Sequence, residues 1–273
     1  MTGARVKAIG VLAAAGALAG CGNLQIGGGE STDRTYDVPG AVRTLQISSG
    51  HRVEIVGSDS PGVRVTERLR WSNDHNKPKT SHTSANGTLT LKGRCAEGIM
   101  GGSRCQVVFH VRVPRGTTLK IQGGDGSVAA TGLTGDVSIR TASGSVTARD
   151  LHARTLSVDS EDGRAAVSGE AGTTELTTRT GTIDATGLRT GRFTARSVDG
   201  SVRASFAAPP SLVDVDSRTG TIRLGLPANG AYAVTTRLRT GREHVDPAIH
   251  RDSQAPNKVN VSSDDGSIFL APA

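Results

Sequence analysis

Cysteine is the residue of this sequence with the most specific chemistry, and the first of its three cysteines ends an apolar segment. Cys21 stands directly after Ala19 and Gly20. The segment before it begins with Arg5 and Lys7, holds no acidic residue, and is too short to span a bilayer as a stable helix. A thiol readily takes a diacylglyceryl group as a thioether, and small residues let a peptidase reach the preceding bond. We therefore expect cleavage before Cys21 and lipidation of its sulfur.

The stretch Leu18–Cys21 resembles the bacterial lipobox, which makes residues 1–20 a lipoprotein signal peptide. The alternative is an ordinary signal peptide with a chance cysteine. Residues 21–36 are rich in glycine and serine at their start, and we expect them to form a flexible tether. The expected localisation is extracytoplasmic, lipid-anchored to the bacterial cell membrane, so the membrane is one expected partner.

Cys95 and Cys105 form an even pair once Cys21 carries lipid, and export would place them in an oxidising compartment. The Gly-rich segment between them can turn back on itself, so the sequence predicts a disulfide. A zinc site is the weaker alternative, because no second cysteine pair or spaced histidine pair lies nearby.

No catalytic or metal-binding residue set emerges from the remaining reactive side chains. The histidines are scattered and lack metal-ligand spacing: His51, His75, His82, His110, His152, His244 and His250. No Gly-x-Ser-x-Gly elbow or phosphate-binding loop is present. We expect no enzyme activity, no catalytic residue, no cofactor and no bound metal.

The second half of the chain repeats itself, and the repeat predicts the fold. Small turn glycines recur every 18–21 residues until the last interval of 25: Gly126, Gly144, Gly163, Gly181, Gly200, Gly220, Gly241 and Gly266. Positions seven and five before each glycine, and two and four after it, are apolar except at Thr174, Thr236 and Glu243. Apolar residues that alternate on both sides of a corner indicate two short strands per repeat.

A short β repeat of this kind predicts an all-β, right-handed parallel β-solenoid (β-helix) in which rungs of about 18–21 residues stack in sequence order. In that order Val215 lies between Ala195 and Thr236. An antiparallel sandwich is the alternative, but it does not explain columns that recur in register. Calcium binding at the turns is disfavoured, because half of the residues preceding the glycines are Ser or Thr.

The predicted solenoid domain covers residues 37–273, with irregular N-terminal rungs over 37–118 and regular repeats over 119–273. A separate small β domain in the first part is the alternative. Only 3% of the residues are aromatic, so we expect a core of small aliphatic side chains. No other apolar run is long enough to cross a membrane.

The formal net charge of +7 favours an anionic partner. Sequence-order stacking would place Asp216 between Arg196 and Arg237. The simpler interpretation is a ladder of solvent-exposed ion pairs without a binding role. The alternative is weak, salt-sensitive binding to anionic envelope polymers or lipid headgroups, with these candidate contacts: Arg179, Arg196, Arg218 and Arg237. Another surface protein is a further candidate partner, and nucleic acid is not expected.

The sequence resembles a bacterial putative-adhesin family, domain of unknown function 4097. The resemblance rests on 36–55, on 111–133, and on the recurring Asp-Gly-Ser-Val and Thr-Gly-Thr-Ile rungs, and it covers nearly all of the mature chain. It implies a secreted or lipidated surface β-solenoid and carries no catalytic residue. The expected function is a non-enzymatic, membrane-anchored adhesin or scaffold module of the cell envelope. The alternatives are a polysaccharide-active β-helix enzyme, which the few aromatic residues disfavour, and an ice-binding threonine ladder, which the next rungs interrupt.

Overall fold

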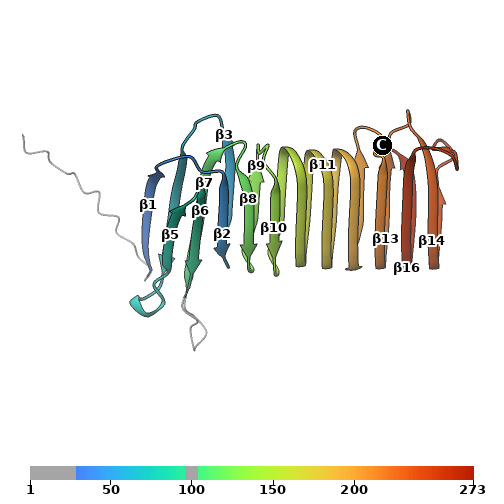
Figure 1. Cartoon of the computed structure of the whole chain (residues 1–273). Coiled ribbons are helices and arrows are strands. Elements are labelled where there is room, and N and C mark those ends of the chain that lie inside the picture. The colour runs from blue at the N-terminus through green and yellow to red at the C-terminus, as the bar shows by residue number, and fades with distance from the viewer. Residues whose placement is uncertain (1–28, 96–103) are drawn as a thin grey trace, which may run out of the picture.

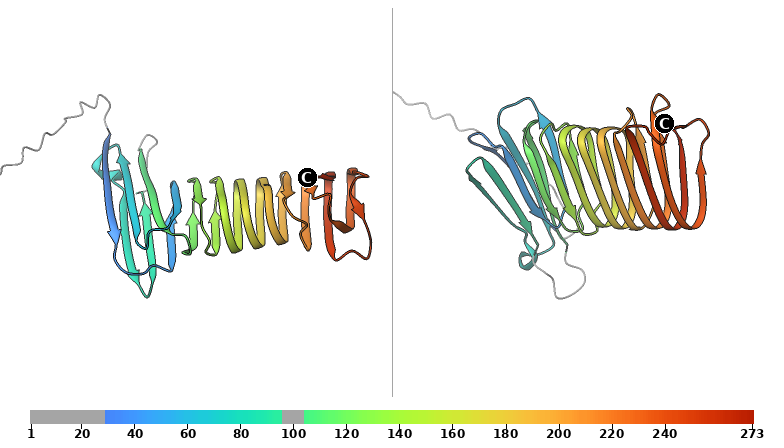
Figure 2. Two further views of the ribbon diagram at one scale, coloured as in Figure 1. Left: turned by 90° about the horizontal axis from the view of Figure 1, so that it is seen from above. Right: turned by 45° about the vertical axis from the view of Figure 1, so that its right-hand side comes forward.

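The computed structural model describes residues 29–95 and 104–273, which form an all-β structure with one short 3-10 helix. A single mixed, mostly parallel sheet of 16 strands curves around the core into a nearly closed, elongated body (Figures 1 and 2). The N-terminal part contains β1 (Glu30–Val38), β2 (Thr44–Ser49), β3 (Val53–Ser58), β4 (Val63–Trp71), η1 (Asp74–Asn76), β5 (Lys79–Ala85), β6 (Thr88–Arg94) and β7 (Cys105–Pro114). The rest contains β8 (Thr118–Gly123), β9 (Val128–Thr131), β10 (Val137–Thr141), β11 (Val146–Asp199), β12 (Val202–Phe206), β13 (Leu212–Leu226), β14 (Ala231–Val245), β15 (His250–Arg251) and β16 (Asn257–Pro272).

Each repeat forms one coil, by which we mean a turn of chain with a strand before and a strand after its corner glycine. Adjacent coils pair in parallel and in register, as Leu119 with Val137 and Val137 with Leu156 show. On the other side of the corner, Val128 pairs with Val146 in the same way. These residues are at most 2% exposed, so the apolar columns line one continuous core, as the sequence predicted.

The corner glycines are required by the close stacking of coils as well as by the turn. A Cβ atom on Gly220 would overlap the carbonyl oxygen of Gly200, and a Cβ on Gly200 would overlap that of Gly181. Gly220 also has a φ of +131°, a conformation that other residues rarely adopt. A side chain at this column would therefore push neighbouring coils apart.

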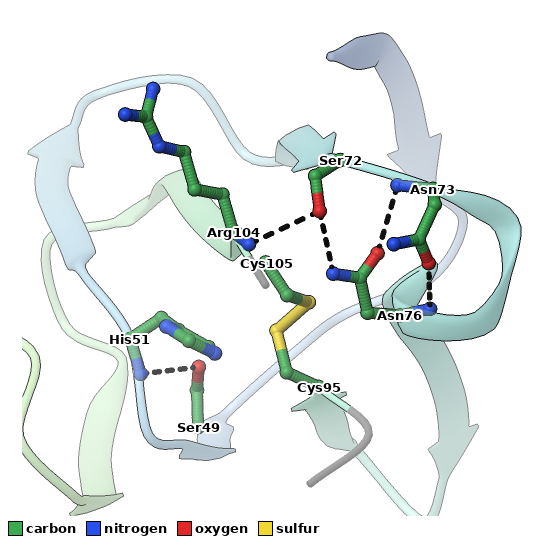
Figure 3. Close-up of a disulfide and its surroundings, with 8 residues drawn as sticks. All are labelled: Ser49, His51, Ser72, Asn73, Asn76, Cys95, Arg104 and Cys105. Atoms are coloured by element: carbon green, nitrogen blue, oxygen red, sulfur yellow. Dashed lines mark hydrogen bonds between the residues drawn. A yellow bond between two sulfur atoms is a disulfide. The ribbon is translucent and has the colours of Figure 1, made fainter. Parts of the chain in front are cut away.

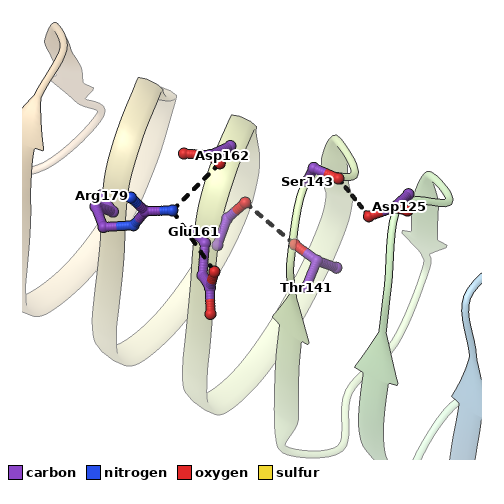
Figure 4. A network of polar contacts seen from close by, with 7 residues as sticks. Asp125, Thr141, Ser143, Glu161, Asp162 and Arg179 are labelled. Atoms are coloured by element: carbon purple, nitrogen blue, oxygen red, sulfur yellow. Dashed lines mark hydrogen bonds and ion pairs between the residues drawn. The ribbon is translucent and has the colours of Figure 1, made fainter.

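A column of buried hydroxyl groups runs just before the corner, three residues ahead of six of the eight corner glycines. Thr141 Oγ1 donates to Ser160 Oγ at 3.1 Å, and Thr178 Oγ1 donates to Ser197 Oγ at 3.3 Å; Figure 4 shows the first of these bonds. All four residues are at most 4% exposed. The sequence interpretation missed this inward column, because Ser and Thr at a corner also fit an exposed turn.

The order of the last coils differs from the sequence order. Val213 pairs with Val259, and Val259 pairs in turn with Val234, so β16 lies between β13 and β14 (Figure 1). The expectation that Val215 neighbours Thr236 is therefore wrong: Val215 pairs with Ala195 on one side and Val261 on the other. Along the chain, β14 of the outermost coil therefore precedes β16, although β16 lies between β13 and β14 in the sheet.

The N-terminal end uses the same arrangement. Strand β2 pairs in parallel with both β6 and β8, and β3 pairs with both β7 and β9. The first coil of the chain is thus inserted between the 88–114 coil and the 118–131 coil. Hydrogen bonding runs without interruption from these irregular coils into the regular ones.

Strand β1 corrects the expected extent of the flexible tether. Residues 30–36, assigned to the tether from the sequence, pair antiparallel with β4 from Glu30 opposite Trp71 to Tyr36 opposite Val65. The sequence signal was weak because β1 is an edge strand with mostly exposed polar residues. Residues 21–28 lie outside the described residues.

Two of the polar exceptions in the apolar columns lie at the end of the body. Thr236 and Glu243 belong to β14, the outermost coil, and Thr236 Oγ1 donates to Glu243 Oε1 at 2.7 Å. Near the other end, Glu67 is 2% exposed and accepts hydrogen bonds from Tyr36 Oη at 2.8 Å and Thr80 Oγ1 at 2.7 Å. Burial and the Glu67 carboxylate raise the pKa of Tyr36 above its ordinary value, which keeps its hydroxyl protonated as a donor.

Candidate functional site: a basic groove

A groove of about 520 Å³ lies on the outer face of the sheet, across β6, β2, β8, β10 and residues 157–159 of β11. Its side chains come from positions that alternate with buried core residues. On β8, for example, Leu119 and Ile121 are buried, so Lys120 and Gln122 point outward. The core pattern of these strands therefore fixes which residues face the groove.

The groove is built from two rows of side chains that cross neighbouring strands. Parallel register places the first row in the order Thr90, Gln46, Lys120, Ser138 and Ser157. It places the second row in the order Lys92, Ser48, Gln122, Arg140 and Asp159. Long basic side chains and shorter serines therefore line the same hollow.

Positive charge dominates the groove. Four cations line it, namely Lys92, Arg94, Lys120 and Arg140, against one carboxylate, that of Asp159. Asp159 accepts a hydrogen bond from Arg140 Nε at 3.0 Å, which leaves the two lysines without a carboxylate partner among the described residues. Lys79 stands opposite Arg94 on β5 and extends the basic surface at the rim.

The arginines that the sequence singled out lie elsewhere and do not form one column. Arg179 pairs with Asp162 at 3.3 Å and Glu161 at 3.7 Å, as Figure 4 shows. Arg196 pairs with Glu175 at 3.5 Å, and Arg218 with Asp199 at 3.6 Å. These three lie in a surface of alternating charges, whose field largely cancels at a distance.

Arg237 corrects the expected charge ladder. It lies on the outermost coil, in register with Ser262 on β16. Asp216 pairs with Ser262 from the other side, so Arg196, Asp216 and Arg237 are not consecutive neighbours. The expectation was wrong because it assumed that coils stack in sequence order. As contacts with an anionic surface, the four arginines stay a prediction.

Cys95 and Cys105 are joined by a disulfide, with their Cα atoms 5.8 Å apart (Figure 3). The bond ties the end of β6 to the start of β7. Beside it, Ser72 Oγ accepts hydrogen bonds from Asn76 Nδ2 at 2.8 Å and from the Arg104 backbone N–H at 3.2 Å. Together these contacts join the segments around β6, β7 and η1. The predicted lipidation residue, Cys21, lies outside the described residues.

The titratable groups of the described part of the chain form no grouping of three or more His, Cys, Asp or Glu suited to a metal ion. One imidazole–carboxylate contact is present, between His110 Nδ1 and Glu54 at 2.6 Å, and Arg52 also pairs with Glu54. This contact lies on β3 and β7, away from the groove. Nor do the described residues include a helix of the length and apolar character needed to cross a bilayer.

The sequence interpretation missed the groove because its residues come from distant segments. Lys92 and Lys120 line one groove because β6 and β8 both pair with β2, one on each side of it. One part of the groove was present in the sequence pattern, because the outward column of the repeats begins with Gln122 and Arg140. Finding the other residues of this row would have required knowing the order in which the first coils stack.

Comparison with one solved structure shows the same fold at low sequence identity. A putative adhesin from Bacteroides fragilis aligns with a TM-score of 0.54 at 16% identity, over 88% of this chain and 97% of that one. A putative adhesin from Parabacteroides distasonis gives a TM-score of 0.44 at 9% identity, over 88% and 97% of the two chains. A putative lipid binding protein from the same species gives 0.43 at 14% identity, over 87% and 96%.

No curated protein matches this sequence. A family model described as toastrack, domain of unknown function 4097, matches residues 42–270, which include the inserted coils at both ends. The match spans most of the chain and agrees with the resemblance noted in its rungs. This protein therefore belongs to the toastrack family of domain of unknown function 4097.

Proposed function

We propose that this protein is a non-enzymatic binding module of the cell envelope that holds a linear anionic polymer in the basic groove. The observation that carries the proposal is the charge of the groove, where four cations face one carboxylate that is already paired. A concave surface of one sign focuses its field on an oppositely charged chain. The paired state of Asp159 also leaves no free acid–base pair in the groove, which favours binding over hydrolysis.

The spacing of the cations suits an extended ligand. Lys92 on β6 and Lys120 on β8 are separated by β2, and Arg140 follows on β10. With strands about 4.8 Å apart, these charges are spread over about 15 Å. A polymer lying across the strands could contact them in succession, whereas a single small anion could not.

The proposal includes export and anchoring. Residues 1–20 would act as the signal peptide, Cys21 would carry the lipid, and 21–29 would connect it to the β body, which we describe as a right-handed β-solenoid. The disulfide between Cys95 and Cys105 supports an oxidising, extracytoplasmic location. Cys21→Ser should release the protein from membranes or leave it unprocessed. A processed mutant that stays on membranes would contradict the anchor without affecting the groove.

The groove is tested with polyphosphate as the polyanion and dextran as the neutral control. The soluble chain without residues 1–20, carrying Cys21→Ser, should bind polyphosphate at low salt and release it near a few hundred millimolar salt, as screening shortens the field. Lys92→Gln with Lys120→Gln should weaken binding by about 5- to 10-fold, the value of two exposed ion pairs.

The matched control is Arg196→Gln with Arg237→Gln, which removes the same net charge from the regular coils. If the groove is the binding site, it should change the affinity for polyphosphate by less than about two-fold, because Arg196 is already paired and both residues lie away from the groove; a larger loss would favour the arginine contacts expected from the sequence. Equal losses in the two double variants would show that net charge alone drives binding. Absence of any binding at low salt would overturn the proposed function.

A further inference from the structure

One aromatic side chain lies outside the core. Phe269 on β16 stands between Ile268 and Leu270, which are both 0% exposed, so it points to the outer face. The remaining aromatic residues are all accounted for by the interior: Trp71, Phe109, Phe193, Phe206 and Tyr232 are buried, and Tyr36 bonds to Glu67. Phe269 is therefore the one aromatic residue of the described chain that packing of the core does not explain.

Phe269 belongs to a row of side chains that crosses five neighbouring strands. Parallel register gives the order Asp184, Arg203, Arg223, Phe269 and His244. The Arg223 guanidinium carbon lies 5.1 Å from the centre of the Phe269 ring, and the His244 ring lies 6.5 Å from it on the other side. The row therefore combines an aromatic surface with hydrogen-bond donors.

The two arginines of this row keep free donor groups. Arg203 and Arg223 are exposed and form no ion pair with a carboxylate of the described residues, whereas Asp184 is paired with Arg164. The cation–π contact of Arg223 with the Phe269 ring involves no hydrogen bond, so its N–H groups remain available as donors. Adjacent guanidinium groups of this kind suit a carboxylate, which accepts paired N–H bonds.

A hollow of about 330 Å³ lies along this row, and Phe269, Arg203 and Arg223 form one of its sides. The next row across the strands holds small residues in register with one another: Ser205, Gly225 and Ala271. Their small size leaves space for the hollow. The hollow, the outward aromatic ring and the unpaired guanidinium groups are thus found in one place.

We propose that this hollow, the Phe269 site, binds a pyranose sugar that carries a carboxylate. C–H groups of the sugar pack against the part of the Phe269 ring that faces the hollow, beside the Arg223 guanidinium, and its carboxylate accepts hydrogen bonds from Arg203 and Arg223. The site goes beyond the basic groove, because it uses strands on the other side of the corner glycines and coils in the C-terminal half. It would let the protein recognise the kind of sugar in a polymer as well as its charge.

The test uses trigalacturonate as the acidic ligand and maltotriose as the neutral one, with binding followed by NMR at millimolar concentrations. Trigalacturonate should bind saturably, and maltotriose should bind at least about ten-fold more weakly, because it lacks the carboxylates. Phe269→Ala and Arg203→Gln should each weaken trigalacturonate binding by about five-fold or more. Both changes are outward-facing, and thermal unfolding confirms that each variant is folded.

Two controls separate this site from the groove. Val56→Ala removes another exposed apolar side chain, at the N-terminal end of the body, and should leave trigalacturonate binding unchanged. The groove variant Lys92→Gln with Lys120→Gln should also retain it. Loss of trigalacturonate binding in the groove variant, with retention in Phe269→Ala, would overturn the proposal and assign the sugar to the groove. Equal binding of maltotriose, or no binding of either sugar, would overturn it as well.

Discussion

The inserted position of β16 can be tested by cross-linking, because sequence order and the observed order predict opposite results. Asp214 on β13 and Thr235 on β14 both have Asn260 as their register partner. Adjacent strands are about 4.8 Å apart, so Cα atoms two strands apart are separated by about 10 Å. A disulfide needs a Cα–Cα distance below about 7 Å. Stacking in sequence order would instead bring residues 214 and 235 together.

Three double-cysteine variants are made in a Cys21→Ser background that keeps the native disulfide. Asp214→Cys with Asn260→Cys, and Thr235→Cys with Asn260→Cys, should each form a cross-link under mild oxidation. Asp214→Cys with Thr235→Cys should remain reduced. Peptide mass spectrometry without reduction identifies each linked pair. A 214–235 link without a 214–260 link would refute the coil order, and with it the explanation of why Arg196, Asp216 and Arg237 are not consecutive.

Three further predictions concern stability. Gly220→Ala should lower the free energy of unfolding by about 3 kcal/mol or more, because strain at its φ adds to overlap with the neighbouring coil. Gly191→Ala is the control, since its Cβ would lie 3.4 Å from the nearest atom, and it should cost under about 1 kcal/mol. Denaturant titrations measure both values. Val215→Asp should cost about 4 kcal/mol or more by burying an unpaired charge, and Asp214→Asn under about 0.5 kcal/mol; equal losses would mean that the inward register is wrong. Burial lowers the pKa of His51 below its ordinary value of 6.5, so the folded state disfavours its protonation and the unfolding free energy should fall as pH drops below about 6.5. His51→Gln should remove part of that fall, and an unchanged pH profile would contradict the assignment.

The apolar columns could be predicted from the sequence because burial on one face demands alternation around every corner. Thr174, an exception to the columns, also fits the interior: it is 0% exposed and donates to Thr190 Oγ1 at 3.3 Å. A small hydroxyl residue can take an inward position when a neighbouring coil supplies an acceptor. Composition alone does not reveal that partner.

The order of the coils could not be predicted, and the reason is physical. Val259 fits the column equally well beside Val213 or beside Val234, because every coil presents the same kind of residue at that position. Identical columns fix the register of a pair but not the choice of partner. The groove depended on the same missing information, since the position of β2 between β6 and β8 decides which outward side chains line it.

An inward-positioned charge on the C-terminal end of the body also limits how far the stack can grow. A column of parallel coils ends in unpaired backbone groups, and a second copy could add to them and extend the sheet into a fibre. An added coil over β14 would cover the carboxylate of Glu243, which lies in an inward position and is exposed only because β14 is outermost. Burying that charge is costly without a new partner, so its column favours termination at this coil. This glutamate, one of the residues that interrupt the apolar repeat, therefore helps to keep a self-complementary strand pattern finite.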